Sequence, residues 1–136
     1  MSFKVVGESK KRMYGPRGLL VCGFSAEERA AVRTFFEKKT FGQVPLVFST
    51  DPDRLSLVKE LLAKNHCSGA DQPCFLERAI IMSGITEQEL HYIMSEYKKT
   101  GLPKPLWATL TPTSENWTIE ALVAELASER RHMPPH

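Results

Sequence analysis

Three side chains that could bind a metal or take part in redox chemistry lie in one polar stretch of the chain. They are His66, Cys67 and Cys74, in a loop expected over residues 66–75. Zinc sites that can be read from a sequence carry closely spaced ligand pairs, and this stretch has no second pair and no fourth ligand. We therefore expect no metal site. Cys67 and Cys74 form a plausible redox pair, although two free thiols are the plainer expectation, and Cys22 should pack inside an apolar strand.

Two glycine-containing turns stand before predicted helices and could bind an anion. Gly23 and Ser25 follow the first expected strand, and Gly84 and Thr86 follow the third. Main-chain N–H groups at a helix N-terminus attract negative charge, and in a parallel sheet both turns would lie at one edge. The plainer interpretation is that Ser25 and Thr86 only cap their helices. The sequence has no G-x-G-x-x-G after a strand and no Walker motif, so no cofactor is predicted.

An enzymatic nucleophile would need an oriented base beside it, and no such arrangement can be assigned from the sequence. Two of the four histidines lie in the C-terminal tail. Acidic residues gather at predicted helix starts, where they complement the helix dipole without a catalytic role. The residues favour a protein that is not an enzyme.

A segment between two tryptophans is the most unusual part of the sequence. The candidate partner-binding residues are Trp107, Thr111, Thr113, Asn116 and Trp117. One interpretation is a binding loop with an aromatic wall. The other is that Ser114 or Asn116 caps the last helix and that Trp117 anchors this helix by packing.

Four short apolar runs alternate with four helical patterns. Strands are expected at residues 19–22, 45–49, 79–82 and 106–110. Ser25 with Glu28, and Thr86 with Glu89, are capping boxes that predict helix starts. Asp51 followed by Pro52 predicts the start of the second helix, whose apolar face would include Leu55. The last helix should fray into a tail from Arg130.

The two halves of the chain repeat one pattern, which predicts an internal duplication. Gly23-Phe24-Ser25 corresponds to Gly84-Ile85-Thr86, and Pro45-Leu46 corresponds to Pro105-Leu106. Each half reads as a βαβα unit with parallel strands, and strands that are apolar throughout should be covered on both faces. The expected fold is α/β, with a four-stranded, mainly parallel sheet in the order 2-1-3-4, flanked by helices. The relative direction of the first and third strands stays open.

The length of 136 residues suits one domain, and the charge is unevenly placed. Residues 1–17 carry five basic side chains against Glu8 alone, which predicts a basic flexible arm with a balance of +4. The α/β domain is expected over residues 18–128, with halves 18–65 and 76–128 joined by loop 66–75, and residues 129–136 form a tail.

The rest of the chain is near neutral, so nucleic acid is an improbable partner. No apolar run reaches the roughly 20 residues that cross a bilayer, and no secretory signal is visible. We expect a soluble intracellular protein, which could form a homodimer through an uncovered sheet edge.

The stretch from Leu20 to Ala127 resembles an uncharacterised family of bacterial and plant-plastid proteins, domain of unknown function three-seven-eight-three. The resemblance rests on the turn at 23–25 and on the cluster from 105 to 117, in particular Pro105-Leu106-Trp107-Ala108 and Asn116-Trp117. It implies a plastid stroma or a bacterial cytoplasm, and it brings no catalytic residues.

Together these patterns favour a non-enzymatic protein-binding or complex-assembly module that presents a sheet edge and the loop at 111–117 to a partner. The alternative is a small-anion or nucleotide-binding regulator or enzyme that uses the turns after the first and third strands.

Overall fold

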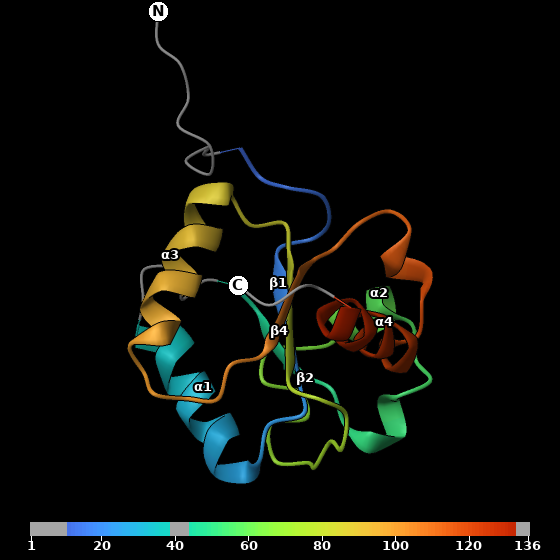
Figure 1. Cartoon of the computed structure of the whole chain (residues 1–136), viewed down its shortest axis with the longest axis horizontal. Coiled ribbons are helices and arrows are strands. Elements are labelled where there is room, and N and C mark those ends of the chain that lie inside the picture. Colours follow the sequence, from blue (N-terminus) through green and yellow to red (C-terminus); the bar gives the residue numbers. More distant parts are fainter. Residues whose placement is uncertain (1–10, 39–43, 133–136) are drawn as a thin grey trace, which may run out of the picture.

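Each strand of the central sheet is apolar on both faces, and helices cover both faces in the computed structural model, which describes residues 11–38 and 44–132 (Figure 1). The strands are β1 (Gly18–Cys22), β2 (Leu46–Phe48), β3 (Ala79–Ser83) and β4 (Leu106–Thr109). Every residue of β1, β2 and β3 is buried. The four strands lie where the apolar runs predict them, within one or two residues at each end.

The sheet has the order β2-β1-β3-β4, which confirms the predicted order. Within each half the strands are parallel, since β1 pairs with β2 and β3 pairs with β4 in this sense. The two halves meet at β1 and β3, which run antiparallel with Leu20 opposite Ile81. The sheet is therefore mainly parallel, with one antiparallel seam at its centre.

The helices α1 (Ala26–Lys38) and α3 (Glu87–Lys98) cover one face of the sheet, and α2 (Val58–Leu62) and α4 (Ile119–His132) cover the other (Figure 1). Neighbouring strand residues point to opposite faces, so each strand feeds two cores. Leu19 and Val21 pack with Val32, Phe35 and Ile93 under α1 and α3. The residues of the second core include Leu20, Cys22, Val58, Leu61, Ile119 and Val123.

The second predicted helix is two separate helices in the structure, and the first of them begins one residue earlier than the sequence predicts. Thr50, not Asp51, is the N-cap of a short 3-10 helix, η1 (Asp51–Asp53), and α2 begins only at Val58. Between them the chain pairs with the start of α4, because Leu57 forms an antiparallel bridge with Thr118. Main-chain groups used in this pairing are not free for a helix. Leu55 is consequently 66 % exposed instead of lying on an apolar face.

The two halves make the same cross-contact twice, related by a shift of 61 positions. Arg17, just before β1, binds both carboxylate oxygens of Glu89 at the start of α3. Arg78, just before β3, binds both oxygens of Glu28 at the start of α1, at 3.0 and 2.9 Å. This geometry relates the halves by a pseudo-twofold axis through the β1–β3 seam. The duplication of the sequence itself stays a prediction.

The predicted flexible arm is wrong for the residues that the structure describes, which begin at Lys11. Arg12 forms an antiparallel bridge with Thr86, and the N–H of Met13 donates to the carbonyl of Ile85 at 2.8 Å. Residues 1–10 lie outside the described part. At the other end, α4 continues to His132, so no tail begins at Arg130.

The outer side of β2 is covered by the loop at 66–75. The N–H of Phe48 donates to the carbonyl of Ser68 at 2.8 Å, and the N–H of Cys67 donates to the carbonyl of Leu46 at 2.6 Å. These bonds occupy main-chain groups that an edge strand would otherwise present to another chain. Across the described residues, no helix has the length and apolar character needed to cross a membrane.

Candidate functional site

The strand β4 forms the other edge of the sheet, and its outer main-chain groups are open within the described residues. The N–H of Leu106 donates to Arg78 and that of Leu110 donates to Met82, both at the inner side. Because bonding alternates along a parallel ladder, Trp107 and Thr109 direct their N–H and C=O groups outward. No described segment pairs with these groups.

Two grooves follow this edge on either side of the strand. The first, of about 440 Å³, extends from Met94 of α3 across Trp107 to Leu126 of α4. The second, of about 300 Å³, lies between β4 and α4 and continues to Trp117. Leu126 and Glu129 line both grooves, so the two are adjacent. The edge is thus flanked by apolar side chains from two helices.

The structure brings most of the predicted partner-binding residues to these grooves. Thr111, Thr113 and Trp117 line the second groove, and Trp107 lines the first. Trp107 also packs edge-to-face on Tyr97, with ring centroids 5.3 Å apart, which fixes its position. Asn116 lines neither groove, and its Nδ2 donates to the carbonyl of Pro112 at 3.4 Å.

Local hydrogen bonds hold the loop in place. The N–H of Thr111 donates to Oγ of Ser114, and the N–H of Ser114 donates to Oγ1 of Thr111, both at 3.0 Å. This reciprocal pair starts the 3-10 helix η2 (Ser114–Asn116). The cap of α4 is Thr118, whose Oγ1 accepts from the N–H of Ala121, so the prediction that Ser114 or Asn116 caps this helix is wrong.

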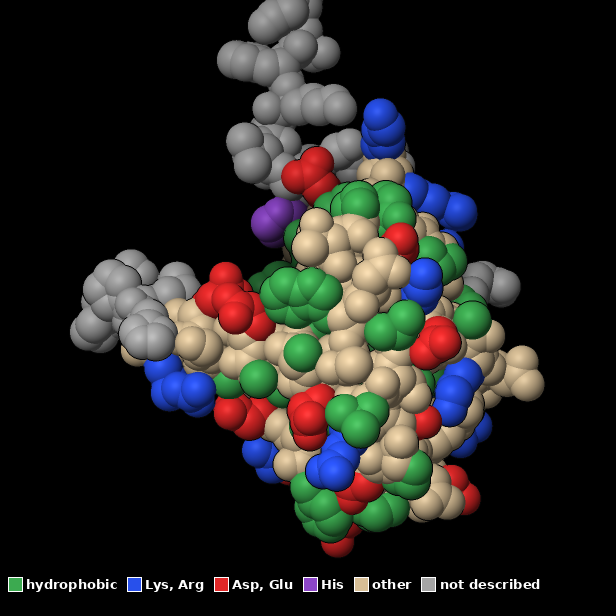
Figure 2. All heavy atoms as spheres, turned by 90° about the vertical axis from the view of Figure 1, so that its right-hand side faces the viewer, with side chains coloured by type: hydrophobic (Ala, Val, Ile, Leu, Met, Phe, Trp, Pro, Cys, Tyr) green, Lys and Arg blue, Asp and Glu red, His purple; other side chains and the backbone are tan. Residues whose placement is uncertain are grey.

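Trp117 combines a fixed backbone with an accessible ring. Its carbonyl accepts from the N–H of Val58 at 2.9 Å, while its side chain leaves the residue 36 % exposed at the groove. An accessible tryptophan on a held main chain is suited to binding, because little backbone entropy is lost when a partner covers its ring. Figure 2 shows the face that carries α2 and α4, where acidic, basic and hydrophobic side chains are interspersed.

The two predicted anion-binding turns do not share an edge of the sheet. The antiparallel pairing of β1 with β3 places Gly18 opposite Ser83 and Cys22 opposite Ala79. Gly23 and Ser25 therefore lie at one end of the sheet, and Gly84 and Thr86 lie at the other. The prediction of one shared anion site is wrong, because it assumed that β1 and β3 run parallel.

Both turns do form the predicted capping boxes. The N–H of Glu89 donates to Thr86 Oγ1, and the N–H of Thr86 donates to the Glu89 carboxylate. Ser25 and Glu28 make the same reciprocal pair. Hydrogen bonds from Arg17 hold the pKa of Glu89 below its ordinary value, and hydrogen bonds from Arg78 lower the pKa of Glu28.

The three cysteines are free thiols in the structure. Cys67 lies beside the start of β2, where its N–H donates to the carbonyl of Leu46. Cys74 lies beside the other end of β2, because the carbonyl of the preceding Pro73 accepts from the N–H of Asp51. The Sγ atom of Cys74 is 3.4 Å from Oγ of Ser49. The structure therefore does not support the Cys67–Cys74 redox pair.

The described residues do hold one group of three potential metal ligands, Glu37, His66 and Cys67. The donor set differs from the one considered from sequence, since Glu37 of α1 takes the place of Cys74. The N–H of Leu46 donates to Nδ1 of His66 at 3.0 Å, which leaves the ring proton on Nε2. Coordination through Nε2 would require this hydrogen bond to break, so the geometry disfavours a metal here.

Sequence reasoning missed two kinds of site residue. Met94 and Leu126 fit the apolar pattern of core positions in their helices, yet they line the groove beside β4. Arg78 was not singled out, although it stands 61 positions after Arg17 and six before a turn glycine, a signal that the repeat carried.

The fold and the grooves define an α/β protein with one edge strand open among its described residues. Residues 78–133 match a family described as a domain of unknown function (DUF3783), and the match runs from Arg78 through β3, α3, β4 and α4. The predicted resemblance is thus confirmed for the second half of the fold, which contains the open edge. Comparisons with curated proteins and with solved structures gave no match.

Proposed function

We propose that this protein is a non-enzymatic binding module that takes an extended segment of a partner protein as an additional strand along β4. The observation that carries the proposal is the outward direction of the main-chain groups of Trp107 and Thr109, which would pair with such a strand. Addition of a strand to an open sheet edge is a common mode of peptide recognition, in which main-chain bonds give affinity and side-chain pockets give specificity.

The grooves indicate what kind of segment fits. An added strand would direct alternate side chains to the two faces of the sheet. One set would contact Met94 and Trp107, and the other would contact Leu122, Leu126 and Trp117. We therefore expect a segment with apolar residues on both faces and polar residues at the end near Lys104 and Glu129, which line the same groove.

Assembly or regulation of a larger complex, in a plastid stroma or a bacterial cytoplasm, is the role that we propose for this module. A second copy of the chain is a further possible occupant of the edge. Interspersed charges on the face in Figure 2 support a protein partner over nucleic acid, which favours a continuous basic surface.

A displayed peptide library tests the proposal directly. Peptides selected on the intact protein are measured again on Thr109→Pro, which removes one outward N–H without breaking the ladder to β3, and on Trp117→Ala. Leu55→Ala, at an exposed residue that lines neither groove, is the matched control. We expect both groove variants to weaken binding by about 5–30-fold, because a lost hydrogen bond or a lost aromatic contact costs about 1–2 kcal/mol.

Hydrogen exchange then locates the bound strand. The amide protons of Trp107 and Thr109 should exchange slowly only when a peptide is bound, since only the added strand would accept them. Selected peptides that bind equally to all three variants, or that leave these two amides unprotected, would contradict the proposal. Dimerisation that Thr109→Pro abolishes would assign the edge to a second copy instead.

A further inference from the structure

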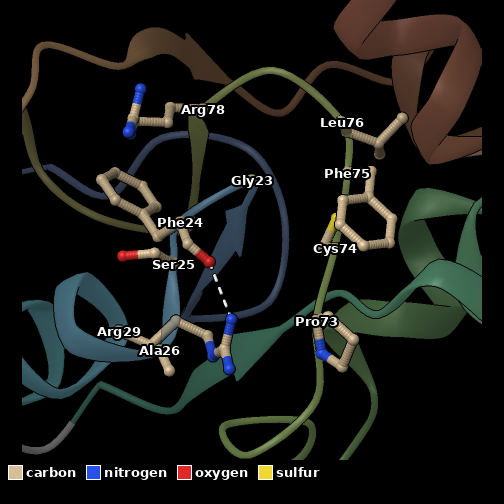
Figure 3. Close-up of a pocket in the computed structure, with 10 residues that line it drawn as sticks. All are labelled: Gly23, Phe24, Ser25, Ala26, Arg29, Pro73, Cys74, Phe75, Leu76 and Arg78. Atoms are coloured by element: carbon tan, nitrogen blue, oxygen red, sulfur yellow. Dashed lines mark hydrogen bonds between the residues drawn. The ribbon is translucent and has the colours of Figure 1, made fainter.

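A second pocket, remote from the β4 grooves, contains a buried cation without a carboxylate partner. The pocket measures about 420 Å³ and lies between the start of α1 and the segment Pro73–Leu76 (Figure 3). Arg29 forms part of its wall and is only 7 % exposed. Among the described residues, no Asp or Glu forms an ion pair with Arg29.

The guanidinium of Arg29 uses only part of its donor capacity. Its Nε donates to the carbonyl of Ala70 at 2.9 Å, and its Nη1 donates to the carbonyl of Phe24 at 2.8 Å. Figure 3 shows the group between the start of α1 and Pro73, with the bond to Phe24 dashed. Nη2 has no acceptor among the described residues. Arginine has five N–H donors, so at least two remain available to a ligand.

An anion beside this charge would stabilise it. The side chain of Arg29 lies back over the first turn of α1, where the helix already carries its positive end. Burial of a charge without a counter-ion costs several kcal/mol in general. At the position 61 residues later, the chain has Leu90, which packs against the core under α3. The corresponding place in the second half therefore takes an apolar side chain, whereas in the first half the arginine also bonds the carbonyls of Phe24 and Ala70.

The same comparison explains why the pocket is open. In the second half, residues 12–14 pair with residues 84–86 and occupy the space before α3. In the first half, the corresponding residues 73–75 bond to Asp51 instead, through the N–H groups of Asp51 and Phe75. This leaves the turn at Gly23–Ser25 accessible from the pocket.

The free donors at the pocket belong to Arg29, because the side chain of Ser25 is engaged with Glu28: Ser25 Oγ accepts from the N–H of Glu28, and the Ser25 hydroxyl also hydrogen-bonds the Glu28 carboxylate. The free Nη donors of a guanidinium fit two oxygens of an anionic group. The positive end of α1 beside them favours the more highly charged phosphate over a carboxylate. Pro73 and Phe75 form an apolar rim, and Phe75 is 86 % exposed.

We infer that this pocket binds a small organic phosphate, with the phosphate on Arg29 at the start of α1, and with an apolar or aromatic group against Phe75. Arg78 also lines the pocket, but its guanidinium is held by Glu28, so Arg29 supplies the charge. This site is independent of the strand site at β4.

Phenyl phosphate is a suitable probe, followed by NMR titration of the full chain, with inorganic phosphate and benzoate as comparison ligands. We expect phenyl phosphate to bind with a Kd in about the millimolar range and inorganic phosphate to bind more weakly. Arg29→Leu, which copies the residue of the second half, should weaken phenyl phosphate binding by about 10–100-fold. Arg33→Leu, one turn further along α1 and outside the pocket, is the matched control and should bind normally.

Phe75→Ala keeps the test decisive if Arg29→Leu does not fold. Because Phe75 is largely exposed, its removal should leave the fold intact, weaken phenyl phosphate and leave inorganic phosphate unchanged. The inference is overturned if phenyl phosphate does not bind, if a folded Arg29→Leu binds it normally, or if benzoate binds equally well. Loss of the inorganic phosphate signal in Phe75→Ala would also overturn it.

Discussion

The two arginine–glutamate pairs that join the halves should differ in strength, and substitution of the glutamates measures this difference. Glu89→Gln removes the charge that Arg17 binds but keeps an oxygen that can still accept from the N–H of Thr86, so the capping box survives. Glu28→Gln does the same for Arg78. The pairs have the same bidentate geometry, so burial is the main variable between them.

The expected magnitudes follow from exposure. The side chains of Arg17 and Glu89 are each 23 % exposed, whereas that of Arg78 is 40 % exposed and that of Glu28 is 18 % exposed, so the two pairs differ mainly in the exposure of the arginine. A hydrogen bond to a charged group contributes about 1–1.5 kcal/mol more than a neutral one, so Glu89→Gln should lower the free energy of unfolding by that amount. Solvent screening reduces the effect of Glu28→Gln to about 0.2–1 kcal/mol.

Urea unfolding followed by tryptophan fluorescence provides the measurement, at neutral pH and stepwise below the ordinary glutamate pKa of 4.5. Because Arg17 lowers the pKa of Glu89 in the folded state, its stabilisation is complete above that value and is lost as the pH falls below it. The difference between wild type and Glu89→Gln should therefore vanish in acid. Equal effects of the two substitutions, or a difference that persists in acid, would refute the reasoning.

Three further results are expected. Ser83→Ala should leave stability unchanged or raise it by up to about 1 kcal/mol in urea unfolding, since the buried Oγ has no partner among the described residues; a clear loss would point to a bound water. Gly84→Ala should lower the free energy of unfolding by more than about 2 kcal/mol, because φ is +63° and a Cβ would meet the main chain of residues 15–17. Gly101→Ala, which has open space around it, should lower it by only about 1 kcal/mol. Burial raises the pKa of Tyr97 to about 12 from an ordinary 10.0. The stabilisation from the protonated phenol should therefore be complete below pH 10.0 and be lost as the pH rises toward 12. Ultraviolet titration would follow the ionisation, and Tyr97→Phe should abolish this loss of stability.

Much of the fold could be predicted because its signals are local. Capping boxes at Ser25 and Thr86 depend on residues three positions apart, and the apolar runs marked all four strands. The direction of β3 relative to β1 could not be predicted, because strands buried on both faces read the same in either direction. The two anion turns were expected at the same edge of the sheet because the direction of β3 was unknown. This direction decides which strand ends are neighbours, and the antiparallel pairing separates the turns.

The candidate site was accessible to sequence reasoning only in part. Trp117 and Thr113 stood out by residue type, and they do line a groove. The partners of these residues on α3 and α4 lie on core-like helix faces, and only the end of the sheet at β4 exposes them. Arg29 differs from any surface arginine by its burial alone, which depends on the path of residues 70–76 and is invisible in a helical pattern.

The unequal edges of the sheet limit how many partners it can take. Loop 66–75 already occupies the outer side of β2, while β4 is open within the described residues. A sheet with two free sides can join copies endlessly into a fibre, whereas a sheet with one is saturated by a single contact. Once a strand has paired with β4, no described edge remains for another strand. The protein would therefore end a series of paired strands and not extend it.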